Sequence, residues 1–400
     1  MRHAPAARRP AVRRPAVRRA LALLLGLATL VAPACTPGPG PGDPPSTTAP
    51  PPDPGVVYPG AEWERIDPAE AGFDPAALDR IAADAEAANS NCLVVTRRGR
   101  IVAEWYWNGT DASTVQEVFS VTKSVTSTLV GLAQEDGDLA VTDPAATYIT
   151  EWSGTPSEAV TVEDLISNDS GRQWSLRLDY GDLVTARDRT GFAVGLGQDA
   201  PPGDVWVYNN AAIQTLDAVL ARATGAEPAA YAEDRLFAPI GMADTAMTRD
   251  GAGNTNTFFG LRSTCEDLAR FGYLFLRDGE WDGTQVVPED WVEAATGGAS
   301  QDINAAYGYL WWLNRRGPVT DPLHPLTREE AETAPDLQLA PGAPDDMYWA
   351  RGLGGQVVQI DPGSETVVVR LGPGDAGADY TQADTARVVT EALVDRGPAS

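Results

Sequence analysis

The order of the apolar segments is the feature that most restricts how this chain can fold. Runs typical of β-strands lie at 92–96 and 101–107 and return late, at 307–313, 356–360 and 366–371. The segments between them mostly have the periodicity of helices. Strands near both ends must lie side by side to form a sheet. We therefore predict an α+β fold, in which an antiparallel sheet built from the N- and C-terminal segments is flanked by helices and carries a mostly helical inserted subdomain at about 140–260.

Capping residues and apolar periodicity locate the helices. Asp74 can cap a first helix that has Pro75 at its first position. Five further helices are expected at Ser120–Gln134, Thr161–Ser167, Asn210–Thr224, Ala229–Phe237 and Glu266–Leu276, and a last one at Thr381–Val394.

The first 58 residues indicate an export address followed by a spacer. Residues 1–35 are typical of a signal peptide, with an Arg-rich start and an apolar run of 13 residues that is too short to span a bilayer. We expect the lipoprotein type, with Cys35 as the lipid-bearing residue and the cell envelope as the location, although the usual Leu three positions earlier is missing. Simple cleavage and secretion is the alternative. Residues 36–58 form a Pro/Gly-rich linker, and 59–396 form the globular domain.

Charge and the rarest residues exclude several function classes. The formal net charge of −26 disfavours nucleic acid as a partner. The only histidines are His3 and His324, so no multi-His metal site can form, and a Ser-His-Asp triad would depend on His324 alone. We expect no metal or cofactor, and membrane contact only through a lipid on Cys35. Cys92 and Cys265 either form a disulfide or remain two free thiols.

A single lysine stands among 29 arginines, three residues after a serine, in Phe119-Ser120-Val121-Thr122-Lys123-Ser124. On a helix this spacing places Ser120 and Lys123 on one face. Lysine can lose its proton when buried, whereas arginine cannot. The pattern predicts Ser120 as nucleophile and Lys123 as the base that activates it. The alternative is a capped helix start with an exposed lysine.

Tyr208-Asn209-Asn210, at a predicted helix start, is a second candidate segment. Tyr208 can relay a proton to the leaving group, and Asn210 can donate to Lys123 or to a substrate carbonyl. The structural alternatives are core packing for Tyr208 and a helix cap for Asn210.

A third candidate segment is rich in glycine and precedes an apolar strand. Gly352, Gly354 and Gly355 permit close approach of a substrate to the backbone, and an N–H group there can join that of Ser120 in an oxyanion hole. A simple strand-entry turn is the alternative. We predict that Trp311 binds substrate together with Asn210 and these glycines. The alternative for Trp311 and Trp312 is a place in the sheet core.

Together these segments resemble the serine β-lactamase-like, or penicillin-recognising, superfamily, which includes class C β-lactamases, DD-peptidases, esterases and 6-aminohexanoate-oligomer hydrolases. The matching segments are Phe119–Ser124, Leu165–Gly171, Tyr208–Asn210, Leu236–Met242 and Gly260–Gly272. The resemblance implies that Ser120 forms the acyl-enzyme, that Lys123 and Tyr208 move protons, and that the N–H groups of Ser120 and Leu353 hold the oxyanion.

One departure from the family's pattern concerns the third segment. β-Lactamases and DD-peptidases carry Lys or His and then Thr/Ser before the glycine, but here Ala350 and Arg351 precede Gly352. This form is more similar to the esterase and aminohexanoate-amidase branch. Our hypothesis is an exported serine hydrolase that cleaves a small-molecule ester or amide through acyl-Ser120. The alternatives are a DD-peptidase or weak β-lactamase and, in another class, a non-hydrolytic cell-surface binding module.

Overall fold

The computed structural model describes residues 55–374 and 380–395, so the predictions for residues 1–54, including the signal peptide and Cys35, lie outside the described residues. A six-stranded sheet has the order β2-β1-β13-β12-β11-β9, and every adjacent pair is antiparallel. Its strands are β1 (Cys92–Arg97), β2 (Arg100–Tyr106), β9 (Trp312–Leu313), β11 (Tyr348–Gly352), β12 (Gln356–Asp361) and β13 (Thr366–Leu371). Because β1 pairs with β13 from Cys92↔Leu371 to Arg97↔Thr366, the predicted union of the two ends in one α+β sheet is confirmed.

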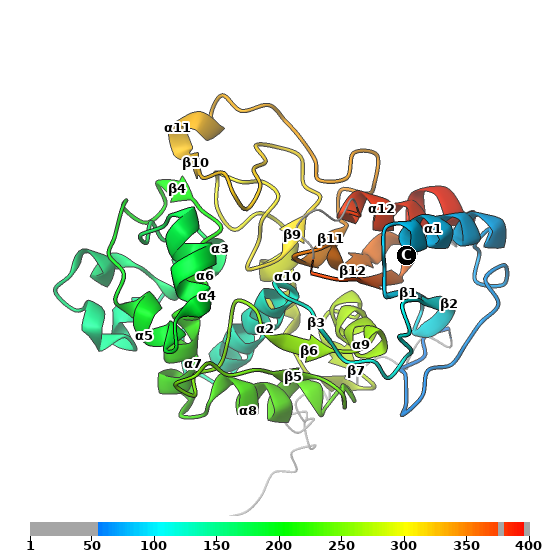
Figure 1. Ribbon diagram of the computed structural model, residues 1–400, viewed down its shortest axis with the longest axis horizontal. Coiled ribbons are helices and arrows are strands. Elements are labelled where there is room, and N and C mark those ends of the chain that lie inside the picture. Colours follow the sequence, from blue (N-terminus) through cyan, green and yellow to red (C-terminus); the bar gives the residue numbers. More distant parts are fainter. Residues whose placement is uncertain (1–54, 375–379, 396–400) are drawn as a thin grey trace, which may run out of the picture. The chain divides into compact units, whose positions relative to one another are not determined.

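Helices cover both faces of this sheet (Figure 1). One face carries α1 (Pro75–Ala87), α12 (Gln382–Arg387) and the π-helix η7 (Val388–Ala392). The other carries α9 (Cys265–Leu276) and α2 (Val121–Glu135). A Cβ atom on Gly272 of α9 would lie 2.6 Å from a Val367 methyl group, so the missing side chain lets α9 pack directly on the strands.

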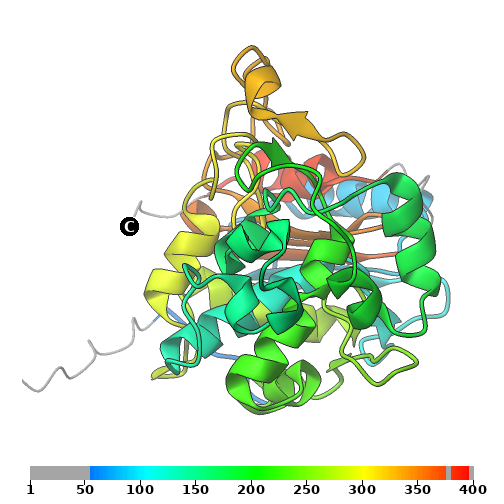
Figure 2. The ribbon, with the colours of Figure 1, turned by 90° about the vertical axis from the view of Figure 1, so that its left-hand side faces the viewer.

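A mostly helical layer precedes α9 in the chain and lies in front of the sheet in Figure 2. Its helices are α3 (Val162–Ser167), α4 (Leu183–Thr185), α5 (Arg189–Val194), α6 (Asn210–Gln214), α7 (Leu216–Thr224) and α8 (Pro228–Ala232), joined by the short helices η1 (Ala145–Thr147), η2 (Thr150–Trp152), η3 (Pro156–Ala159), η4 (Leu178–Asp182) and η5 (Glu233–Phe237). The remaining elements are β3 (Gln116–Glu117), β4 (Val205–Trp206), β5 (Ala246–Met247), β6 (Leu261–Ser263), β7 (Glu280–Trp281), β8 (Thr284–Gln285), α10 (Glu289–Thr296), β10 (Leu326–Thr327), α11 (Arg328–Ala331) and η6 (Pro362–Ser364).

Local sequence explains several boundaries. The Asp74 carboxylate accepts the N–H of Ala76 and Pro75 opens α1, as predicted.

The prediction of a strand over 307–313 is wrong except for the last two residues, which form β9. Leu310 has a φ of 61°, in the left-handed region, and its N–H bonds to the carbonyl of Ile166 instead of a neighbouring strand.

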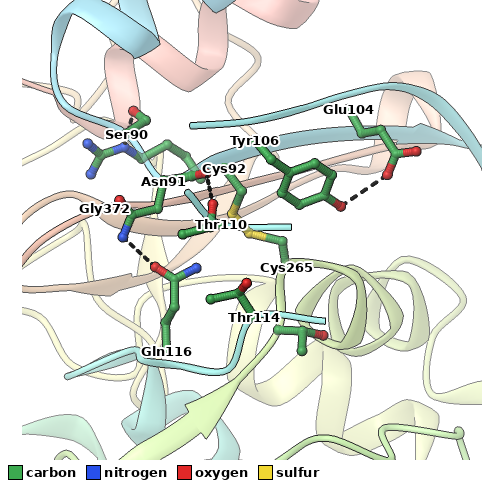
Figure 3. Close-up of a disulfide and its surroundings, with 12 residues drawn as sticks. Ser90, Asn91, Cys92, Glu104, Tyr106, Thr110, Thr114, Gln116, Cys265 and Gly372 are labelled. Carbon is green, nitrogen blue, oxygen red and sulfur yellow. Dashed lines mark hydrogen bonds between the residues drawn. A yellow bond between two sulfur atoms is a disulfide. The ribbon is translucent and has the colours of Figure 1, made fainter. Parts of the chain in front are cut away.

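Cys92 and Cys265 form a disulfide, which decides between the two alternatives left open by the sequence. The bond ties β1 to the first residue of α9, two elements that are 173 residues apart in the chain (Figure 3). Within 55–374 and 380–395, no helix combines the length and the apolar character that a membrane crossing requires.

Candidate active site

Ser120 and Lys123 meet at the start of α2. Lys123 Nζ lies 2.7 Å from Ser120 Oγ, and Nζ also donates to the carbonyl of Phe258 at 2.8 Å. Ser120 is half-buried, whereas only 1% of Lys123 is exposed. The alternative of a surface lysine beside a capped helix start is therefore wrong, and Ser120 makes no side-chain cap for α2.

Burial determines the protonation of Lys123. The ammonium lies 4.6 Å from the ring centre of Tyr208 and 5.6 Å from that of Phe258. Loss of solvation lowers the pKa of Lys123 to about 7, although the negative charge of Asp179 opposes the shift. A large fraction of the amine is therefore neutral near pH 7, and a neutral amine in contact with a hydroxyl can accept its proton.

The backbone before Ser120 is held in an uncommon conformation. Phe119 has a φ of 49°, which is unfavourable for a residue with a side chain. The Glu117 carboxylate accepts the N–H groups of Phe119 and Gly260, and so clamps the turn to a neighbouring segment. Within the described part of the chain, the N–H of Ser120 donates no hydrogen bond. That donor is left for an external acceptor.

Tyr208 lies in the same group of side chains as Ser120 and Lys123. It is buried, and its ring stacks on Trp312 with the ring centres 5.6 Å apart. Burial raises the pKa of Tyr208, and a hydrogen bond with Ser120, the positive charge of Arg351 and a hydrogen bond with Trp312 oppose that rise. The structural alternative of simple core packing does not account for a phenol beside the Ser120 hydroxyl.

Asn210 and Asp179 order the segment that carries Tyr208. Asn210 opens α6, and the cap of that helix is Asn209, whose side chain accepts the N–H of Ala212. Asp179 of η4, which is 1% exposed, accepts the N–H and the side-chain amide of Asn210 and the N–H of Ala211. One N–H of the Asn210 side chain is thus used by Asp179, and its oxygen has no partner among the described residues.

The glycine-rich segment, at the edge of the sheet, approaches the backbone just before Ser120. Gly352 ends β11, and a Cβ on it would lie 2.4 Å from the carbonyl oxygen of Val118. Leu353, Gly354 and Gly355 form the turn to β12, and both of those glycines have positive φ angles, 77° and 73°. The N–H of Leu353, like that of Ser120, donates to no other group in 55–374 or 380–395. The two alternatives for this segment are therefore compatible: it forms the turn into β12, and its backbone also lies close to a neighbouring segment.

Trp311, predicted as a pocket residue, lies in the core instead. It is fully buried, with its ring 4.5 Å from that of Phe275 and 5.7 Å from that of Phe271, both on α9. The left-handed Leu310 ends the regular alternation just before it, so the sequence alone does not decide which tryptophan faces inward. The residue at the pocket is Trp312.

A pocket of about 460 Å³ lies beside this group. It is lined by Trp312, Val319, Thr320, Asp321, Pro322, His324, Leu339, Arg351 and Gln382. The Arg351 guanidinium stacks on Trp312 at 4.9 Å and makes no ion pair or hydrogen bond with any residue that the structure describes. Burial lowers the pKa of Arg351 to about 10, so it stays charged at neutral pH. His324, the remaining triad candidate, pairs with Asp321 on the exposed side of the pocket.

Sequence reasoning missed three functional candidates: Asp179, Arg370 and Gln356. Arg370 had a detectable signal, because it is a charge within the apolar run Val367–Leu371. Asp179 had none, since it stands in a polar segment that contains other acids. Among the described residues, no group of three or more His, Cys, Asp or Glu side chains is arranged to hold a metal ion.

Comparison with known proteins identifies the family of the chain. A family model described as "Beta-lactamase" matches residues 78–392. The 6-aminohexanoate-dimer hydrolase of Paenarthrobacter ureafaciens is 24% identical over 358 residues, which cover 79% of this chain and 83% of that protein.

Solved structures share the fold. A protein of Bacillus anthracis described as a 6-aminohexanoate-dimer hydrolase aligns with a TM-score of 0.60 and 22% identity, over 77% of this chain and 81% of the other. A class C β-lactamase in complex with cefoxitin aligns with a TM-score of 0.59 and 16% identity, over 81% and 98%.

Proposed function

Since the chain belongs to the β-lactamase family of serine hydrolases, we propose that it is an exported enzyme that cleaves a small ester or amide through an acyl-Ser120 intermediate. The observation that carries this proposal is the contact of 2.7 Å between Lys123 Nζ and Ser120 Oγ, made by an amine that burial keeps partly neutral. Relatives named as 6-aminohexanoate-dimer hydrolases support an amide or a related ester as the substrate.

In the proposed acylation step, Lys123 takes the proton of Ser120 as Oγ attacks the substrate carbonyl carbon. The oxygen of that carbonyl becomes negative and accepts the free N–H groups of Ser120 and Leu353. Collapse of the tetrahedral intermediate breaks the bond to the leaving group. Tyr208 supplies a proton to the departing oxygen or nitrogen and recovers one from the Lys123 ammonium.

In the proposed deacylation step, water attacks the acyl-Ser120 carbonyl and gives its proton to the neutral amine of Lys123. The same two N–H groups hold the second oxyanion. When the bond between the acyl carbon and Ser120 Oγ breaks, the Lys123 ammonium returns that proton to Oγ, so the enzyme ends in its starting state and the carboxylic acid is released. No metal or cofactor enters either step.

The Asn210 oxygen, the backbone of Gly352, Gly354 and Gly355, and Trp312 are the groups proposed to contact the substrate. Export through the signal peptide, with lipidation at Cys35, remains part of the proposal. The Cys92–Cys265 disulfide supports it, because such bonds persist in oxidising compartments.

A second candidate function is favoured by Arg351. A partly buried guanidinium that lacks a carboxylate partner is a strong site for an anion, and substrates of DD-peptidases and β-lactamases carry a carboxylate. The lysine or histidine that precedes the third motif in those enzymes is Ala350 here, so we place this activity second.

Turnover of p-nitrophenyl butyrate and of matched anilides separates these functions. We expect ester turnover that Ser120→Ala abolishes, and nitrocefin turnover at least 100-fold slower. Nitrocefin hydrolysis at a comparable rate, weakened by Arg351→Met, would move the assignment to the second candidate. Stable labelling of Ser120 by a fluorophosphonate without turnover of any substrate would indicate the non-hydrolytic binding module.

A further inference from the structure

The Leu353–Gly355 turn has little intrinsic rigidity. Gly354 and Gly355 both adopt positive φ angles, and Leu353 is 48% exposed, so neither a side chain nor packing fixes the turn from the solvent side. An N–H group that must face a developing negative charge is useful only if its direction is fixed before the reaction. The contacts that keep this turn rigid must therefore come from the protein interior.

Arg370 provides contacts of this kind from β13. Its Nη1 donates to the carbonyls of Gly354 at 2.6 Å and Gly355 at 3.0 Å. Its Nε donates to Ser90 Oγ at 2.7 Å, and its Nη2 donates to the carbonyl of Ala88. Ser90 is among the residues drawn around the disulfide in Figure 3. The side chain is fully buried, its guanidinium lies 4.9 Å from the ring centre of Tyr380, and no carboxylate of the described residues forms a salt bridge with it.

Gln356 holds the same turn from β12. Its side-chain nitrogen donates to the carbonyls of Leu353 at 3.0 Å and Gly372 at 2.8 Å. Its side-chain oxygen accepts the N–H of Gly372 at 2.9 Å, so both ends of the amide are satisfied and its orientation is fixed. All three carbonyls of the turn are thus bound from the interior.

The turn is packed closely at Gly355. A Cβ on Gly355 would lie 2.9 Å from Arg370 Nη1 and 2.5 Å from the carbonyl oxygen of Tyr380. With the carbonyls of Leu353, Gly354 and Gly355 drawn inward, the N–H of Leu353 stays unbonded, as observed. A buried cation is costly unless its donors are used, and the donors of Arg370 are used on this turn and on the segment that carries Ala88 and Ser90.

We propose that Arg370 and Gln356 are positioning residues that preorganise the oxyanion hole, by fixing the carbonyls of the Leu353–Gly355 turn so that the Leu353 N–H faces the substrate. The proposal rests on the proposed function, since it assumes attack by Ser120 and an oxyanion at Leu353. Neither residue touches the reacting atoms.

The test compares Arg370→Met with Arg97→Met as a matched control. Arg97 is also a buried arginine of a central strand, and it donates to the carbonyls of Ser364, Ala71 and Asp395. In the β1–β13 pair, Arg97 lies opposite Thr366, whereas Arg370 lies opposite Leu93. Arg97 and Arg370 are therefore at opposite ends of this strand pair. Both variants should lose thermal stability, but only Arg370→Met should disturb the Leu353–Gly355 turn.

Two readouts separate positioning from stability: kcat/KM for an ester, and the inhibition constant of a boronic acid that forms a tetrahedral adduct with the serine. For Arg370→Met we expect kcat/KM to fall and the inhibition constant to rise by a similar factor, on the order of 10- to 100-fold. Arg370→Lys, which can still reach one carbonyl, should recover part of both. Arg97→Met should change neither by more than about 3-fold.

Gln356→Met gives a second, independent arm if Arg370→Met does not fold. The proposal is overturned if the folded Arg370 and Gln356 variants keep both values within 3-fold of the wild type, or if Arg97→Met loses as much. Failure of the proposed function has a different signature, because Ser120→Ala would then be as active as the wild type or no ester would be turned over.

Discussion

Replacing Lys123 with methionine should abolish activity and stabilise the fold. Lys123 is 1% exposed and has a pKa of about 7 instead of 10.5, so the folded protein holds the amine in an environment that resists its charge. Methionine has a similar length and no charge, and it fits an apolar surrounding without repacking. The active enzyme thus carries a destabilising group that its chemistry requires.

The size of the expected stabilisation follows from the pKa shift of Lys123. A displacement from 10.5 to about 7 corresponds to a penalty on the order of 5 kcal/mol for the charged amine, most of which is felt at pH 7. Against it stand two lost hydrogen bonds, to Ser120 Oγ and to the carbonyl of Phe258, worth about 1–3 kcal/mol together. Lys123→Met should therefore gain about 2–4 kcal/mol in the free energy of unfolding at pH 7.

Urea unfolding at pH 7 and pH 9.5 measures this difference. Because the folded pKa lies below the unfolded one, the unfolded wild type binds the extra proton between about pH 7 and 10.5, and the stability of the wild type rises with pH across that window. The advantage of Lys123→Met should shrink accordingly at pH 9.5. A variant that is less stable than the wild type at pH 7, or whose advantage grows with pH, would refute the reasoning.

Four further predictions concern the same residues and the disulfide. Lys123→Arg keeps a charge but removes the base, so kcat/KM for an ester should fall at least 100-fold while circular dichroism is unchanged; near-normal activity would contradict the mechanism. Plotted against pH, wild-type kcat/KM should rise with an apparent pKa near 7 as Lys123 loses its proton, and a flat profile from pH 5 to 9 would exclude this base. Tyr208→Phe should lower kcat by about 10²–10⁴-fold with Tm within a few degrees, so a loss of less than 3-fold would remove its role. Cys92→Ala with Cys265→Ala should reduce the free energy of unfolding by about 2–5 kcal/mol, and an unchanged Tm would show that the bond does not stabilise the fold.

The parts of the fold that could be predicted are those set by local patterns. Asp74-Pro75 at a helix start, the β1–β2 hairpin and the S-x-x-K helix each express a short-range rule, and the location of strands at both ends implies their union. The pair proposed as nucleophile and base, Ser120 and Lys123, could be located because one lysine stands among many arginines.

The parts that could not be predicted depend on tertiary contacts. The left-handed conformation of Leu310 is held by a bond to Ile166, and it decides that Trp311 enters the core while Trp312 meets Tyr208. The pairing of Cys92 with Cys265 depends on how α9 crosses the sheet, which no local pattern reveals.

The roles of Asp179 and Arg370 were missed for a related cause, although Arg370 is visible as a charge within an apolar run. Each acts on backbone groups of a segment remote in sequence, Asp179 on the start of α6 and Arg370 on the turn after β11. A side chain that binds backbone atoms leaves no complementary residue type in the sequence to point to it.

Rapid mixing of the enzyme with a p-nitrophenyl ester, followed by mass spectrometry of the quenched protein, tests the central claim that a neutral Lys123 activates Ser120. The account predicts an acyl adduct on Ser120 in the wild type, none in Ser120→Ala, and formation at least 100-fold slower in Lys123→Arg. An adduct on another residue, or one that forms on Ser120 at an equal rate without the lysine, would contradict it.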